Sequence, residues 1–144
     1  MSPRESNPDR LSLRLEGDSA IAQAVDATRA FGQAQRLTGD DLARLCIVVE
    51  ELIANLYDHG GVTEQDEVQF ALARDSAGIR VSIIEGGISF NPWSAPIAAE
   101  NGQGGGAGVR LIRAWAELIR YHSSDDGNQL ELLVPVDAAR RSND

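Results

Sequence analysis

The chain contains no lysine, so all 13 of its basic residues are arginine. This absence excludes every mechanism that depends on a lysine amine: a Walker A loop, the strand lysine of protein kinases, Schiff-base chemistry and a Ser-Lys dyad. An anionic ligand would have to be neutralised by a metal ion, by backbone amides or by arginine.

Cysteine and long apolar runs are also scarce. Cys46 is the only cysteine among 144 residues, so no internal disulfide can form. This usage is typical of a reducing compartment, and we expect a cytoplasmic protein with Cys46 as a small buried hydrophobe. No segment approaches the roughly 20 apolar residues of a membrane helix, and residues 1–9 lack a signal-peptide core. The net charge of −9 argues against nucleic acid and anionic membranes as partners.

The apolar spacing predicts one domain at residues 9–137, between tails at 1–8 and 138–144. Strands are expected at 10–16, 67–74, 79–85, 120–123 and 129–136, and helices at 20–36, 42–59 and 109–119. In this order of elements, more pairs of strands are joined by short turns, as in hairpins, than by helices that could connect parallel strands. The predicted fold class is therefore α+β, a two-layer α/β sandwich with helices on one face of a mixed, mostly antiparallel sheet.

The second expected helix carries a polar pair among aliphatic residues. Glu51 and Asn55 are four residues apart, so they project from one face about one turn from each other. A carboxylate beside an amide oxygen can hold a hard cation and position a nucleophile. The alternative is a helix edge that meets water. Glu50 points away from this face and is interpreted as a surface charge.

Two glycine-rich segments could supply a ligand for this edge. Residues 104–108 directly precede the third helix, where successive glycines let backbone N–H groups approach an anion. Glu85 ends a strand before two glycines, and its carboxylate could accept a hydrogen bond from the exocyclic amine of a base. A flexible loop and a solvated strand exit are the respective alternatives.

In order and spacing, these three features resemble the GHKL ATPase superfamily, and most closely its anti-sigma-factor serine kinases of the RsbW type. Residues 51–55 with His59-Gly60 are similar to the N box of that family. Residues 85–87 with Phe90-Asn91-Pro92 are similar to its first glycine box, and residues 105–112 to its second. The resemblance runs from the first strand to the last hairpin and implies a Bergerat-type ATP-binding fold.

The resemblance implies an ATP-dependent protein serine/threonine kinase with ATP and Mg²⁺ as cofactors. Glu51 would be the general base, Asn55 would hold Mg²⁺, and Glu85 would contact the adenine amino group. Residues 93–104 would form a lid over ATP. The base of ATP would pack closely against Gly87. The phosphates would lie against the backbone of Gly105, Gly106 and Gly108. His59 is expected to make a structural hydrogen bond.

Glu85 departs from the family pattern, which has aspartate at this position. One extra methylene would move the carboxylate outward by roughly 1.5 Å. Two alternatives therefore stay open: a non-catalytic nucleotide- or partner-binding module with a degenerate adenine site, and the catalytic domain of a split histidine kinase. The partners that the resemblance implies are an anti-anti-sigma-like protein and a sigma factor, and a homodimer is expected.

Overall fold

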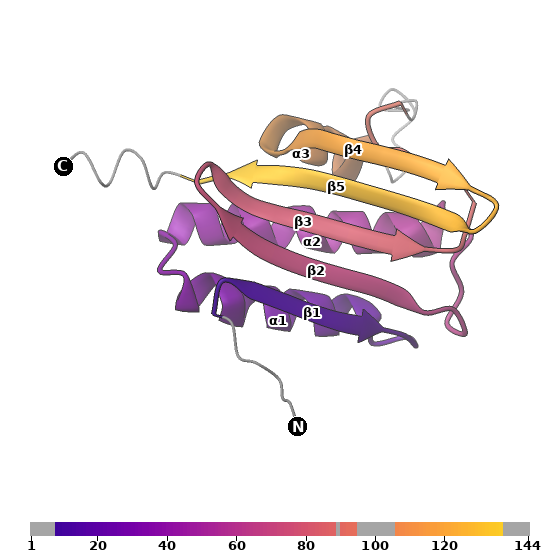
Figure 1. The fold of residues 1–144 in the computed structure, drawn as a ribbon, viewed down its shortest axis with the longest axis horizontal. Helices are drawn as coiled ribbons and strands as arrows, with labels where there is room; N and C mark the ends of the chain where they lie inside the picture. Colours follow the sequence, from indigo (N-terminus) through magenta and orange to yellow (C-terminus); the bar gives the residue numbers. More distant parts are fainter. Residues whose placement is uncertain (1–7, 89, 95–105, 137–144) are drawn as a thin grey trace.

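A five-stranded antiparallel sheet covered on one face by helices forms the fold (Figure 1). The computed structural model describes residues 8–88, 90–94 and 106–136, so most of both predicted tails lies outside the described residues. The elements in chain order are β1 (Arg10–Leu15), α1 (Ala20–Ala34), α2 (Gly39–Asp58), β2 (Val68–Asp75), β3 (Gly78–Glu85), α3 (Gly106–Trp115), β4 (Glu117–Ser124) and β5 (Gly127–Pro135).

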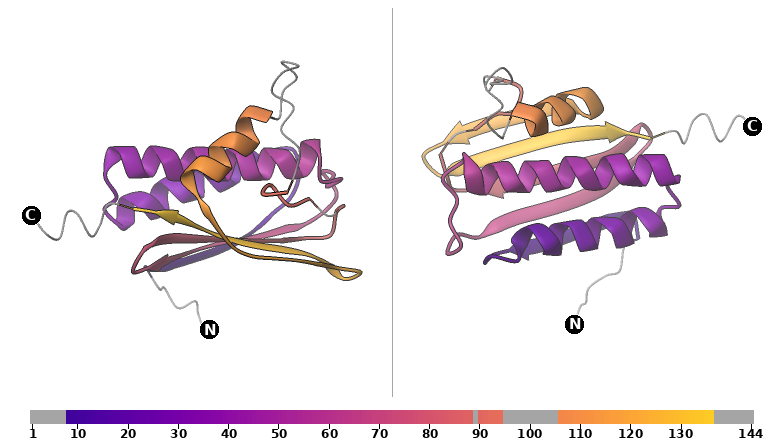
Figure 2. Two further views of the ribbon diagram at one scale, coloured as in Figure 1. Left: turned by 90° about the horizontal axis from the view of Figure 1, so that it is seen from above. Right: turned by 180° about the vertical axis from the view of Figure 1, so that it is seen from behind.

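The strand order is β1-β2-β3-β5-β4, and α1, α2 and α3 lie on the same side of the sheet (Figure 2). This confirms the predicted α+β sandwich. The pairings of the described strands are all antiparallel, although a mixed sheet was expected. The reason is the position of β5. The connection through α3 makes β4 run parallel to β3, but β5 lies between the two strands and is antiparallel to both.

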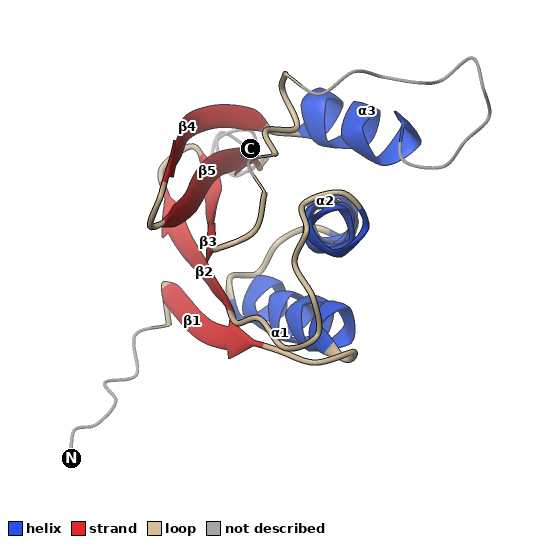
Figure 3. Ribbon diagram, turned by 90° about the vertical axis from the view of Figure 1, so that its right-hand side faces the viewer, coloured by secondary structure: helices blue, strands red, loops and turns tan. Residues whose placement is uncertain are grey.

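The core lies between this sheet and the helices, with α1 and α2 against it side by side (Figure 3). Alternate residues of the strands point inward, as their burial pattern shows. Helix α2 begins where Thr38 accepts a hydrogen bond from the Asp41 backbone amide at 3.1 Å and so caps the helix. The largest side chains of the core are Phe70, Leu15, Leu45, Ile53, Leu72, Ile79, Ile112 and Leu132.

The prediction for the third helix is wrong at both ends. Helix α3 begins at Gly106 and ends at Trp115, and strand β4 begins at Glu117. Leu118 pairs with Leu132, and the register then shifts between Leu118 and Arg120. Ile119 is the extra residue at this irregularity. Leu118 and Ile119 are thus consecutive apolar residues within a strand. Their spacing after Trp115 is that of a last helical turn, and for this reason the helix was predicted too far.

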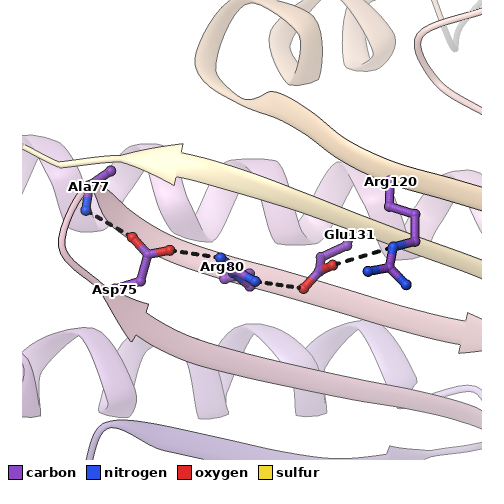
Figure 4. Close-up of polar contacts among 5 residues, drawn as sticks. All are labelled: Asp75, Ala77, Arg80, Arg120 and Glu131. Carbon is purple, nitrogen blue, oxygen red and sulfur yellow. Dashed lines mark hydrogen bonds and ion pairs between the residues drawn. The ribbon is translucent and has the colours of Figure 1, made fainter.

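The face of the sheet that no described helix covers carries a row of ion pairs (Figure 4). Arg80 bonds to Asp75 at 3.1 Å and to Glu131 at 3.3 Å, and Arg120 lies 4.0 Å from Glu131. The Ala77 backbone amide and the Arg80 guanidinium hold the pKa of Asp75 below its ordinary value. Charge pairs across neighbouring strands are typical of a solvated sheet face. None of the described helices is long and apolar enough to cross a membrane.

Candidate functional site

The inner edge of α2 carries Glu51 and Asn55 one turn apart. Asn55 is 3% exposed, and its side-chain nitrogen has no hydrogen-bond partner in the structure. A buried amide without a partner costs free energy, so it marks a place where a ligand could bond. Glu51 is half-buried, and burial, followed by the charges of Glu50 and Asp58, raises the pKa of its carboxyl group. Glu50 itself is exposed.

The first turn of α3 lies against the Glu51 carboxylate. A Cβ atom added at Gly108 would collide with Glu51 Oε1 and would lie 3.0 Å from Glu51 Cδ. Glycine leaves room for the carboxylate in this position, and any other residue would require the Glu51 side chain to move. The structure therefore brings together two of the features found in the sequence. Gly106 begins α3, whereas Gly105 lies outside the described residues.

The segment that follows β3 packs against the residues at the end of α2. The Ile88 backbone amide donates to the Gly60 carbonyl at 2.6 Å. A Cβ atom at Gly87 would collide with that same carbonyl and would lie 3.1 Å from Glu85 Oε1. Gly87 is thus required by packing within the protein, whatever ligand it also admits. His59 stacks on Phe90 with ring centroids 6.0 Å apart, and its backbone amide donates to the Asn55 carbonyl at 2.8 Å at the end of the helix.

Glu85 closes strand β3 and is 7% exposed. Its Oε1 accepts the Gly87 backbone N–H at 2.5 Å, and its Oε2 accepts from Asn128 Nδ2 at 3.2 Å. The side chain therefore bends back over its own backbone, and the outward shift expected from the extra methylene is not what the structure shows. Burial raises the pKa of the Glu85 carboxyl group, and the hydrogen bonds from Gly87 and Asn128 oppose this shift.

Asn128 is a site residue that the sequence analysis missed. The last strand was expected to begin at residue 129, but Asn128 belongs to β5 and pairs with Glu85 across the sheet. The signal that could have found it is the hairpin register. Counting back from the apolar positions of β5 places Asn128 on the inner face, two residues before Leu130.

The first end of the predicted lid is held by contacts with described residues. Arg113 of α3 donates to the Pro92 carbonyl at 2.8 Å, and the Trp93 backbone amide donates to Asn91 Oδ1 at 2.9 Å. The remainder of the lid, residues 95–104, lies outside the described residues.

The side chains available limit what the site could bind. Among the described residues, no group of three or more His, Cys, Asp or Glu side chains could hold a metal ion. A cation near Asn55 would therefore need further oxygen ligands from a bound molecule or water, as Mg²⁺ usually has. The arrangement offers two carboxylates with a raised pKa, Glu51 and Glu85, together with the unpartnered Asn55 amide and a close backbone approach beside a helix N-terminus.

Comparisons with known proteins agree on the fold. The family model described as the histidine kinase-like ATPase domain matches residues 16–134. Among solved structures, the chain is similar to the histidine kinase domain from the Erythrobacter litoralis EL346 blue-light activated histidine kinase, with 15% identity and a TM-score of 0.52. That match covers 85% of this chain and 62% of the other. At this identity it shows the fold alone. No curated protein sequence matches.

Proposed function

This chain belongs to the histidine kinase-like ATPase family, and from that membership we propose that it is an ATP-dependent protein serine/threonine kinase of the anti-sigma-factor type. It transfers the γ-phosphate of ATP to a serine or threonine of an anti-anti-sigma-like partner and sequesters a sigma factor. The observation that carries the proposal is the Glu51 carboxylate, which has a raised pKa and lies against Gly108, one turn from the unpartnered Asn55 amide.

The residues fit Mg²⁺-ATP on two counts. The buried Asn55 amide lacks a partner, and rotation of the amide by 180° would direct its oxygen toward a cation. Gly108 leaves backbone space at the N-terminus of α3, where amides favour an anion. When bound, Mg²⁺-ATP would supply the phosphoryl group and neutralise part of its charge. Glu85 would accept a hydrogen bond from the base, and the exposed Arg110 could contact the phosphates.

The role of Glu51 favours a hydroxyl acceptor. A serine hydroxyl must lose its proton as it attacks, whereas a neutral imidazole nitrogen attacks with its lone pair. A carboxylate is most useful in the first case, and a raised pKa improves its ability to receive the proton. The side chain of Glu51 would take that proton while α2 holds it beside the site.

Glu51→Gln tests the catalytic role. We expect retained ATP binding by calorimetry and a loss of phosphoryl transfer of about 100-fold or more, because the base is removed without a change of shape. Glu50→Gln is the matched control, since Glu50 is the adjacent exposed carboxylate. Unchanged transfer in Glu51→Gln would remove Glu51 from the role of base.

A split histidine kinase is the second candidate, favoured by the fold match to a histidine kinase domain. In that case the phosphate would be carried by a histidine of a partner chain. Phosphohistidine is labile to acid, whereas phosphoserine and phosphothreonine survive it. Acid-stable phosphate on the acceptor is expected from our proposal, and acid-labile phosphate would support the second candidate.

A measurement of nucleotide binding distinguishes the proposed kinase from a non-catalytic binding module. Calorimetry that detects neither ATP nor ADP binding at millimolar nucleotide would identify a binding module with a degenerate site. The proposal further includes a cytoplasmic location and a homodimer. Light scattering that gave the mass of a single 15.5 kDa chain at micromolar concentration would contradict the dimer.

A further inference from the structure

A chain of hydrogen bonds crosses three strands at the end of the sheet that carries Glu85. Glu85 pairs with Asn128 in the β3–β5 register, and Asn128 pairs with Ser123 in the β4–β5 register. Ser123 Oγ lies 2.6 Å from Asn128 Oδ1 and donates to it. Asn128 Nδ2 donates to Glu85 Oε2 at 3.2 Å and to the Gly87 carbonyl at 2.8 Å. Asn128 is 4% exposed.

The orientation of the Asn128 amide follows from its partners. An ionised carboxylate and a backbone carbonyl can only accept hydrogen bonds, so both must face the NH₂ group. The oxygen then faces the Ser123 hydroxyl, which can donate. The side-chain amide thus has a partner on each side, and the direction in which it meets Glu85 is set.

The Glu85 side chain is restrained from two directions. One carboxylate oxygen accepts the Gly87 amide, two residues along the chain, and the other accepts from Asn128 across the sheet. The first contact bends the side chain back, and the second keeps it there. Each oxygen has a second lone pair that could still accept a hydrogen bond from an amino group.

We propose that Asn128 is a positioning residue, which holds the Glu85 carboxylate bent back over Gly87 so that a glutamate can serve at this site. Ser123 fixes the Asn128 amide in turn. The inference rests on the proposed function where it concerns the nucleotide, and on the hydrogen bonds where it concerns the carboxylate. It predicts that the extra methylene of Glu85 is compensated by Asn128, so Glu85→Asp should not tighten ATP binding.

A double-mutant cycle tests whether Asn128 acts through Glu85. The affinity for ATP is measured by calorimetry for the wild type, Asn128→Ala, Glu85→Ala and the double variant. We expect Asn128→Ala to weaken binding about tenfold in the wild-type background and by less than about twofold when Glu85 is already alanine. Equal weakening in both backgrounds would overturn the proposal, because Asn128 would then touch the nucleotide or support the fold.

A second measurement does not depend on nucleotide binding. The titration of the Glu85 carboxyl carbon is followed by NMR. Asn128→Ala should raise the pKa of Glu85, because a donor to its ionised form is lost. Ser123→Ala should raise it by less, since the Asn128 amide stays but is no longer fixed. Gln129→Ala, on the opposite face of β5, should leave it unchanged.

The two measurements separate the possible failures. If the wild type binds no ATP but Asn128→Ala raises the pKa of Glu85, the proposed function fails and the positioning role stands. An unchanged pKa in Asn128→Ala would overturn the positioning role. A gain in ATP affinity of about tenfold or more in Glu85→Asp would show that the glutamate is poorly placed, and this too would overturn it.

Discussion

The folded protein disfavours the ionised form of the Glu51 carboxyl group. Burial and two neighbouring carboxylates raise its pKa above the ordinary value of 4.5. The native carboxyl group therefore binds a proton more tightly than the unfolded one. Its contribution to stability is largest at low pH and declines as the pH rises from 4.5 through the raised pKa.

Replacing this charge should stabilise the protein while abolishing transfer. We expect Glu51→Gln to raise the free energy of unfolding at pH 7 by on the order of 0.5 kcal/mol, a value kept small because the side chain is only half-buried. The difference from the wild type should vanish at about pH 4, where both proteins are neutral at this position. Denaturant unfolding at a series of pH values measures it. A destabilised Glu51→Gln at pH 7 would show that the carboxylate makes a favourable contact instead.

The same sign argument applies to Glu85 and to ligand binding. Its pKa is raised by burial, so it becomes protonated at a higher pH than an ordinary glutamate. A protonated carboxyl group has lost part of its capacity to accept from an amino group. The affinity for ATP should therefore fall as the pH decreases through this raised pKa. Calorimetry in Glu85→Gln, whose affinity should not follow this pH profile, is the control.

The sequence predicted residue positions better than side-chain conformations. The spacing of Glu51 and Asn55 within one helix is local, so helical geometry places them together. The bend of Glu85 depends on Asn128, which is 43 residues away in the chain. No local pattern contains this contact, so the expected outward shift of the carboxylate could not be corrected before the sheet register was known.

Helix α3 can lie close to Glu51 because residue 108 has no side chain. A Cβ atom at Gly108 would collide with the Glu51 carboxylate. Gly108→Ala should therefore force the Glu51 side chain to rotate away, at a cost of about 1 kcal/mol in stability because a half-buried carboxylate can move. Phosphoryl transfer should fall with it, because the carboxylate is displaced.

Gly39→Ala provides the matched control for this element. Gly39 begins α2, and a Cβ atom there would meet nothing within 4 Å. Alanine favours a helix over glycine, so this variant should be neutral or more stable by about 0.5–1 kcal/mol. Thermal unfolding of both variants makes the comparison. Equal stability changes in the two would show that contact with Glu51 does not determine the effect at position 108.

Elements were predicted well where periodicity was unbroken and poorly where it was interrupted. Strands β1 to β3 were predicted to within one residue at each end, and helix α2 to within three residues. The end of α3 was wrong because the register shift in β4 mimics helical spacing. A bulge is set by pairing with β5, which is a tertiary contact that a single segment does not contain.

At the scale of the whole molecule, the excess of acidic residues should govern the response to salt. With a net charge of −9, the acidic side chains repel one another in the compact folded state, and salt screens this repulsion. Salt also weakens the partly exposed pairs of Arg80 with Asp75 and Glu131. Because ion pairs near the surface contribute little, we expect the repulsion to dominate. Thermal unfolding should show a midpoint that rises by on the order of 2 °C between 10 and 150 mM NaCl. A falling midpoint would mean that the pairs dominate.

Strand β5 lies between β3 and β4, although it follows β4 in the chain. During synthesis, α1, α2 and the first three strands can leave the ribosome and pair in sequence. The edge of β3 then stays open until residues 127–135 emerge, because β5, which covers this edge, is made after β4. Glu85 also waits for Asn128 until then. The nascent chain therefore has an interval in which its folded part is incomplete, and the contact between Asn128 and Glu85 forms only once β5 has emerged.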